Sequence, residues 1–169
     1  MASSINLWAA GSAPLLESMK KAATALRQAG VRFALAGGGA AYARGAAPPV
    51  HDIDFVLAQP DVGTATEALA ASGMTIEYPP EGWLVKAFDG GQMIDLIHCL
   101  GGVPVTGDLL DGAEELEVAA IRLPVLGATD VVQVRVLRPD TGIVQSGRDR
   151  MRLDRLPVGV LQQVRPRTM

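Results

Sequence analysis

Aromatic residues and cysteine are scarce in this sequence. Aromatic side chains make up only 4% of the 169 residues, so the core of a folded domain has to be built mainly from alanine, valine, leucine and isoleucine. A single cysteine, Cys99, excludes an internal disulfide and a cysteine-based metal cluster, as is typical of proteins in the reducing cytoplasm. No apolar run reaches the roughly 18 residues of a membrane span, and no basic segment precedes an apolar stretch at the N-terminus. We therefore expect a cytoplasmic protein that does not contact a membrane.

Positive charge is scarce as well, except near the C-terminus. Residues 1–134 carry 7 Lys and Arg against 15 Asp and Glu, whereas residues 135–169 carry 8 Arg, 3 Asp and no Lys. Such an asymmetry is typical of a nucleic-acid-binding tail or of an exposed, poorly ordered end, and the many prolines and glycines favour the second. We expect one domain over residues 1–138 and an irregular, Arg-rich tail over residues 139–169. A change of reading frame after residue 136 is our hypothesis for the different composition of this tail.

Apolar residues are plentiful: 49% of the sequence is hydrophobic and 20% is charged, which is enough to form a globular core. Hydrophobic periodicity predicts an amphipathic helix over residues 14–29, and the turn at 89–91 predicts a hairpin. The other expected elements are helices at 40–47, 62–72 and 109–114 and strands at 31–36, 53–57, 83–88, 92–98 and 116–121. This order of elements favours an α+β or α/β fold with one mixed sheet.

Three aspartates carry the clearest chemical signal. Asp52 and Asp54 are two residues apart on an expected strand, so their side chains point to the same side of the sheet. Asp95 lies in a later apolar strand, where a lone charge is costly to bury. Three converging carboxylates would bind one or two Mg²⁺ or Mn²⁺ ions together with the phosphates of a substrate. The alternative is that the aspartates lie on a solvated face and an edge of the sheet.

A run of three glycines, Gly37, Gly38 and Gly39, ends one expected strand shortly before the next helix. Glycines there allow backbone N–H groups to approach an anion such as a phosphate, although the same run could form only a tight turn. The run lacks the Lys-Ser/Thr of a phosphate-binding loop and the glycine spacing of a dinucleotide site. Together with the aspartates, it indicates a nucleotide site more specifically than either feature alone.

Two basic residues, Arg44 and Lys86, are further candidates for contacts with a phosphate. Arg44 lies on the expected helix after the glycines, and Lys86 lies on the expected strand before Asp95. For both side chains, a solvent-exposed position without a ligand is the alternative. His51 and His98 have the opposite strand parity to the neighbouring aspartates, so we expect neither of them to be a ligand or a base.

These motifs resemble the nucleotidyltransferase superfamily, which has the DNA polymerase beta-like fold. The resemblance is carried by the pair Gly37 and Gly38 at a strand end, the run His-Asp-Ile-Asp-Phe at 51–55, and a third Asp on a later strand. The resemblance covers roughly residues 15–137. Within the superfamily, these motifs look most like those of small bacterial members related to abortive-infection type IV toxins. The sequence departs from them at residues 48–50, which read Pro-Pro-Val where many relatives carry Arg and Thr. The resemblance implies an α+β, minimal nucleotidyltransferase fold in which helices flank a mixed β-sheet.

The resemblance also implies roles for the candidate residues. Gly37 and Gly38 would hold the phosphates of an NTP, Asp52 and Asp54 would be metal ligands, and Asp95 would be the third catalytic carboxylate, which helps to activate the acceptor hydroxyl. The implied reaction is Mg²⁺-dependent transfer of NMP from the NTP to RNA, a protein or a small molecule, with release of pyrophosphate.

Two further interpretations follow from the resemblance. One is that the protein is the toxin of a toxin–antitoxin pair, with an antitoxin as its partner. The other is that it is a catalytically idle relative that binds a nucleotide or a protein. The intact aspartates favour the enzyme, whereas the scarcity of Lys and Arg in residues 1–134 favours the binding module.

Overall fold

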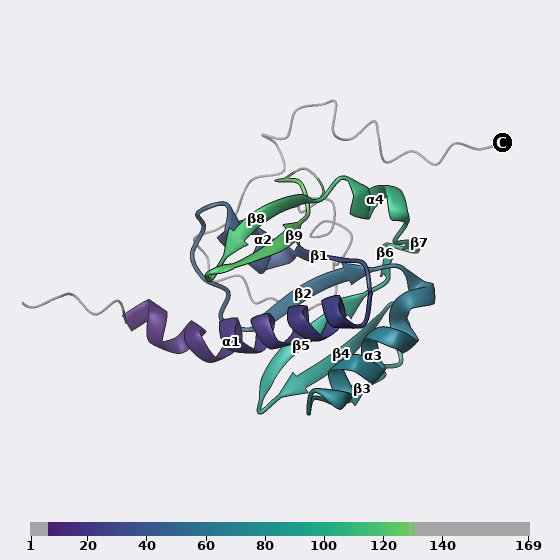
Figure 1. Cartoon of the computed structure of the whole chain (residues 1–169), viewed down its shortest axis with the longest axis horizontal. Helices are drawn as coiled ribbons and strands as arrows, with labels where there is room; N and C mark the ends of the chain where they lie inside the picture. The colour runs from purple at the N-terminus through teal and green to yellow at the C-terminus, as the bar shows by residue number, and fades with distance from the viewer. Residues whose placement is uncertain (1–6, 129, 131–169) are drawn as a thin grey trace, which may run out of the picture. The chain divides into compact units, whose positions relative to one another are not determined.

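The computed structural model describes residues 7–128 and residue 130 (Figure 1). Its helical segments are α1 (Leu7–Gln28), α2 (Gly37–Ala43), the 3-10 turn η1 (Gln59–Asp61), α3 (Val62–Ala71) and α4 (Gly107–Asp111). Its strands are β1 (Phe33–Ala36), β2 (Asp52–Leu57), β3 (Thr75–Glu77), β4 (Leu84–Asp89), β5 (Gln92–Ile97), β6 (Cys99–Leu100), β7 (Val103–Pro104), β8 (Glu114–Val118) and β9 (Ile121–Val125).

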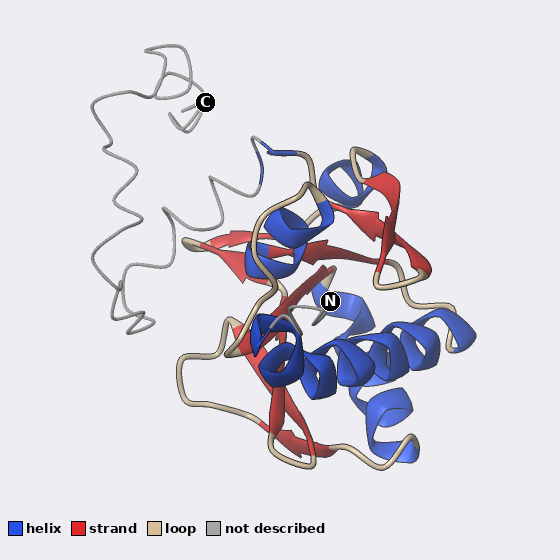
Figure 2. Ribbon diagram, turned by 90° about the vertical axis from the view of Figure 1, so that its left-hand side faces the viewer, coloured by secondary structure: helices blue, strands red, loops and turns tan. Residues whose placement is uncertain are grey.

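Within this part of the chain, seven strands form a mixed sheet in the order β3-β4-β5-β2-β1-β9-β8, and β6 pairs with β7 separately. Strand β2 runs parallel to β5, and β1 runs parallel to β9, whereas the other neighbouring strands are antiparallel. Helices α1 and α3 contact each other and pack on the half of the sheet that contains β2, β4 and β5 (Figure 2). The fold is therefore α+β, a mixed sheet flanked by helices, as predicted.

Alternation along the central strands separates the apolar core from the polar face of the sheet. Ile53 and Phe55 of β2 and Ile94 and Leu96 of β5 are fully buried, whereas the aspartates of the same strands have the opposite parity. Phe33 and Phe55 are the two aromatic residues of the buried core in the described residues, and their rings meet edge to face at 5.1 Å between centroids. Apart from Met19 and Met74, the rest of that core consists of alanine, valine, leucine and isoleucine, as the composition predicts.

Helix α1 begins at Leu7, which is earlier than predicted, so Pro14 lies inside the helix and not in its first turn. A proline has no N–H to donate to the carbonyl four residues earlier, so the helix lacks one hydrogen bond at this point. The predicted amphipathic face after Pro14 is confirmed, since Leu15, Met19 and Leu26 are buried. Packing of this face offsets the missing hydrogen bond.

Two other segments differ from the sequence prediction. Helix α2 begins at Gly37 and not at residue 40, so the glycine run is the first turn of a helix. The strand predicted over residues 116–121 is a hairpin, because β8 and β9 pair through a turn at Ala119 and Ala120, whose φ values are +49° and +68°. Alanine rarely adopts this left-handed conformation, so the sequence pattern does not indicate a turn there.

The predicted hairpin of β4 and β5 is confirmed, with Gly90 and Gly91 in a turn that requires positive φ values of 58° and 101°. Asp89 anchors this turn to helix α1. Its carboxylate accepts hydrogen bonds from the Ser18 hydroxyl at 2.8 Å and from the Lys21 ammonium at 2.7 Å. The hydrogen bond from Lys21 lowers the pKa of Asp89 below its usual value. The β4–β5 hairpin is thus fixed both by its turn and by α1.

No helix in the described ranges is long and apolar enough to cross a membrane. Strands β3, β6 and β7, with three residues or two, are too short for a periodic pattern and were not predicted. The Arg-rich tail predicted over residues 139–169 and the hypothesis of a frame change after residue 136 both lie outside the described residues.

Candidate active site

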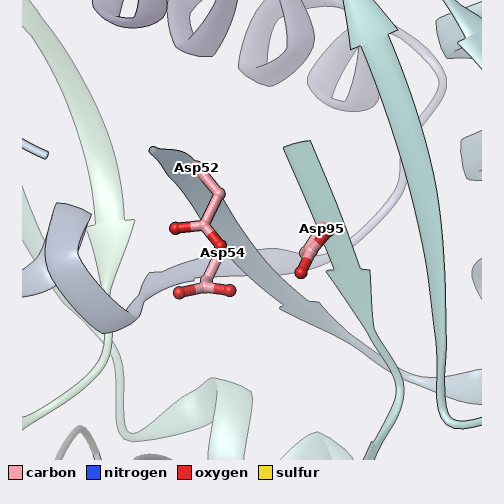
Figure 3. A group of neighbouring side chains, drawn as sticks. All are labelled: Asp52, Asp54 and Asp95. Carbon is pink, nitrogen blue, oxygen red and sulfur yellow. The ribbon is translucent and has the colours of Figure 1, made fainter. Parts of the chain in front are cut away.

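The three aspartates lie together on neighbouring strands of the sheet (Figure 3). Parallel pairing of β2 and β5 places Asp54 directly opposite Asp95, and Asp52 precedes Asp54 by two residues on the same side of β2. Each of the three side chains offers one carboxylate oxygen, and these oxygens all lie within 4.8 Å of one another. The expected convergence of the carboxylates is present.

Burial makes this cluster electrostatically unusual. Asp54 is 5% exposed and Asp95 only 1%, while Asp52 is partly buried. Carboxylates so close together repel each other, and burial strengthens that repulsion because water screens it less. An arrangement of this kind is stable when positive charge lies nearby, and oxygen ligands of this type are those that Mg²⁺ and Mn²⁺ prefer. The donor set therefore fits a divalent cation.

Lys86 supplies one positive charge to the cluster. It is directly opposite Asp95 in the antiparallel pair of β4 and β5, and its ammonium donates a hydrogen bond to Oδ1 of Asp95 at 3.0 Å. The ammonium also lies 3.3 Å from the Sδ atom of Met93. Strand pairing thus places Lys86, a candidate for phosphate contact, beside Asp95, a candidate catalytic carboxylate.

The backbone at Gly37 lies close to the carboxylate of Asp54. Strand β1 ends at Ala36, which is paired with Asp54, and the chain turns into α2 at Gly37 with a φ of +53°. A Cβ atom added at Gly37 would lie 1.9 Å from Oδ2 of Asp54. Only glycine allows both this conformation and this close approach. Gly37 is therefore required by the geometry of the cluster itself.

The other two glycines of the run have different surroundings. A Cβ atom at Gly39 would lie 2.6 Å from Cδ1 of Leu35, so Gly39 permits close packing of α2 on β1. At Gly38 the nearest atom would be Cβ of Pro49 at 3.5 Å, which is ordinary contact. Pro49 belongs to the segment before β2, so this segment lies against the glycine run. The sequence predicts no role for Pro49, although the Pro-Pro pair before the first aspartate is a visible signal.

The remaining candidates lie in other surroundings. Arg44, at the C-terminal end of α2, donates hydrogen bonds to the carbonyl of Ala40 at 3.4 Å and to the carboxylate of Glu114 at 3.3 Å, so its contacts connect α2 to β8. His51 is exposed, and His98 is partly buried beside a cavity of about 300 Å³. Burial lowers the pKa of His98. Neither histidine belongs to the group of possible metal ligands found among the described residues.

Comparison with known proteins identifies the fold. Neither a family model nor a curated protein matches the sequence. The solution structure of the antibiotic-resistance factor ANT(2'')-Ia is similar with a TM-score of 0.57 and 17% identity, over 72% of this chain and 69% of that chain. A candidate nucleotidyltransferase from Thermotoga maritima is similar with a TM-score of 0.58 and 16% identity, over 73% of this chain and 83% of that chain.

A crystal structure of ANT(2'')-Ia in complex with adenylyl-2''-tobramycin is also similar, with a TM-score of 0.54 and 16% identity, over 68% of this chain and 70% of that chain. These similarities establish a nucleotidyltransferase-like fold. In this chain, the fold carries a buried aspartate cluster with the donor set of a metal site.

Proposed function

We propose that the protein is a metal-dependent nucleotidyltransferase that transfers NMP from an NTP to an acceptor. The observation that carries the proposal is the aspartate cluster, whose oxygens lie within 4.8 Å of one another on a nucleotidyltransferase-like fold. Asp52, Asp54 and Asp95 would hold Mg²⁺ or Mn²⁺. When bound, the cation would stabilise negative charge that develops on the phosphoryl oxygens.

The residues of this chain would position the reacting groups. The backbone N–H groups of Gly37, Gly38 and Gly39 would face the phosphates, since a glycine has no side chain of its own to keep a phosphate away from its N–H group. Asp95 would accept a hydrogen bond from the acceptor hydroxyl and so direct its oxygen at the α-phosphate. It would take up the hydroxyl proton as the new P–O bond forms, while the bond to pyrophosphate breaks on the opposite side. Arg44 and Lys86 stay proposed phosphate contacts.

The proposal covers three acceptor classes: RNA, a protein or a small molecule. A small molecule is among the proposed acceptor classes because one solved structure of similar fold, that of ANT(2'')-Ia, is in complex with adenylyl-2''-tobramycin. The sequence resemblance alone extends the proposal to a toxin controlled by an antitoxin. The test of that extension is induced expression in a bacterial host, where growth arrest by the natural sequence but not by Asp54→Asn is expected.

A catalytically idle binding module is the second candidate. It is favoured by the charge distribution, because residues 1–134 carry only 7 Lys and Arg against 15 Asp and Glu. Two of the proposed phosphate contacts, Arg44 and Lys86, are moreover paired with the carboxylates of Glu114 and Asp95. A binding module would take up nucleotide without releasing pyrophosphate.

The experiment that separates the two candidates is a label-transfer assay. The protein is incubated with each α-phosphate-labelled NTP, Mg²⁺ or Mn²⁺, and cell extract separated into RNA, protein and small-molecule fractions. The enzyme proposal predicts label in one fraction, pyrophosphate in equal amount, and loss of both in Asp54→Asn. Asp108→Asn is the matched control, because Asp108 is an exposed aspartate in α4. Nucleotide binding without transfer in any fraction would favour the binding module.

A further inference from the structure

A row of ionisable residues crosses four strands of the sheet at one level. Pairing of neighbouring strands places Glu77 of β3 opposite Lys86 of β4, Lys86 opposite Asp95 of β5, and Asp95 opposite Asp54 of β2. Side chains at paired positions point to the same face of a sheet. Lys86 is therefore part of the same transverse row as two of the three clustered carboxylates.

The Lys86 ammonium and a divalent cation would need the same carboxylate. The ammonium donates to Oδ1 of Asp95 at 3.0 Å, and Asp95 is 1% exposed, so little water is present to screen charges there. A cation coordinated by either oxygen of Asp95 would lie within a few ångströms of the ammonium. Like charges at such a separation repel strongly in a water-poor site.

Lys86 can move away from Asp95 more easily than the aspartates can move. Its side chain is 26% exposed and carries the ammonium on a flexible four-carbon stem, whereas Asp54 and Asp95 are short and buried in the sheet. The second contact of the ammonium is the thioether sulfur of Met93, a weak acceptor that would hold it only loosely. The structure thus combines a fixed carboxylate with a movable cation.

We propose that Lys86 and the catalytic divalent cation compete for Asp95, and that binding of the cation releases the Lys86 ammonium to the triphosphate of the nucleotide. The proposal rests on the proposed function, because it takes Asp95 as a metal ligand. Lys86 then couples the binding of the cation to the binding of the nucleotide. The two bind cooperatively because the cation separates Asp95 from Lys86 and so leaves the ammonium available for the nucleotide.

This exchange predicts opposite effects of one substitution on two affinities. In Lys86→Met, the competing charge is absent, so the affinity for Mn²⁺ alone rises on the order of tenfold. With Mn²⁺ at saturation, the affinity for an unreactive ATP analogue with a methylene group between the α- and β-phosphates falls by a similar factor. A residue that only supports the fold would move both affinities in the same direction.

The experiment measures Mn²⁺ binding from the electron paramagnetic resonance signal of free Mn²⁺, and analogue binding by calorimetry, on the full chain. Lys86→Arg keeps the charge and should bind Mn²⁺ like the natural sequence. Lys21→Met is the matched control, since Lys21 is also a lysine paired with an aspartate of the β4–β5 hairpin, at 2.7 Å from Asp89. If circular dichroism shows that Lys86→Met does not fold, Lys86→Gln replaces it with the same expected result.

The possible outcomes separate the exchange from the proposed function. If Mn²⁺ binds and Asp54→Asn abolishes binding, but Lys86→Met binds Mn²⁺ as weakly as the natural sequence or more weakly, the exchange is wrong and the metal site stands. If no Mn²⁺ binding depends on Asp54, both the metal site and the exchange are wrong. A rise for Mn²⁺ together with a fall for the analogue supports the exchange.

Discussion

Replacement of Gly37 by alanine tests whether the start of α2 and the carboxylate cluster form one unit. The added Cβ atom would lie 1.9 Å from Oδ2 and 2.9 Å from Cγ of Asp54. To reach the 3.0 Å that real Cβ contacts keep, the carboxylate oxygen has to move by about 1.1 Å. Asp54 is 5% exposed on a central strand, so it has little room for this movement.

The cost of Gly37→Ala has two parts. The left-handed conformation of the backbone, with a φ of +53°, costs alanine about 1–2 kcal/mol. Overpacking against Asp54 adds about 1–3 kcal/mol, as is common when atoms are forced into a filled site. We therefore expect the free energy of unfolding to fall by about 2–5 kcal/mol and Tm to fall on the order of 10 °C.

We expect Gly37→Ala to weaken metal binding by the cluster more than it destabilises the fold. A displacement of about 1.1 Å is half of a Mg²⁺–oxygen bond length of about 2.1 Å, so we expect Mn²⁺ affinity to fall at least about tenfold. Thermal unfolding followed by circular dichroism and Mn²⁺ binding measure the two effects. Gly38→Ala is the matched control, because its Cβ atom would meet only Cβ of Pro49 at 3.5 Å. Equal stability and equal Mn²⁺ affinity of Gly37→Ala and Gly38→Ala would show that the start of α2 and the carboxylate cluster are independent of each other.

Four further predictions concern Gly38, the pH dependence of stability at Asp89 and at His98, and the C-terminal segment. Gly38→Val should weaken ATP or GTP binding while Tm changes little, because the first added atom has ordinary contacts; unchanged nucleotide affinity would show that the run is only a turn. The hydrogen bond from Lys21 lowers the pKa of Asp89 in the folded protein below the value of 3.8 that it has in the unfolded chain. The contribution of Asp89 to stability is therefore present above pH 3.8 and is lost as the pH falls through the folded pKa. Urea unfolding should show this loss in the natural sequence but not in Asp89→Asn. Burial lowers the pKa of His98 in the folded protein below 6.5, so the unfolded chain binds a proton at a higher pH than the folded protein does. The free energy of unfolding should therefore fall as the pH drops below 6.5, and His98→Gln should lack that decrease. Limited digestion with trypsin should remove residues 139–169 first and leave a fragment that ends near Arg138, and a resistant tail would contradict the domain boundary that we propose.

The hydrophobic pattern was sufficient to predict most of the central sheet and its hairpin. In the structure the turn consists of Gly90 and Gly91 alone, so Asp89 pairs with Gln92 and Lys86 is opposite Asp95. The sequence predicts a turn over residues 89–91, which would shift the pairing by one residue and place Lys86 opposite Ile94. The ion pair between Lys86 and Asp95 therefore depends on a register that the sequence pattern does not determine.

Other features depend on contacts between distant segments, which periodicity does not determine. The convergence of Asp54 with Asp95 requires parallel pairing of β2 with β5, two strands that β3 and β4 separate in sequence. The need for glycine at position 37 appears only once β1 and β2 are paired and Asp54 is placed. The left-handed turn at Ala119 and Ala120 contains no glycine or asparagine, the residues that would indicate such a turn in the sequence. Pairing of β8 with β9 therefore overrides the preference of alanine for negative φ values.

Crystallography with Mn²⁺ can show whether the three aspartates bind one divalent cation together. Crystals would be grown with Mn²⁺ and the unreactive ATP analogue, and the ion would be located from its anomalous scattering. We expect a peak at about 2.1 Å from carboxylate oxygens of Asp52, Asp54 and Asp95. A cluster without a peak at saturating Mn²⁺, or peaks only at exposed carboxylates such as Asp108, would contradict it.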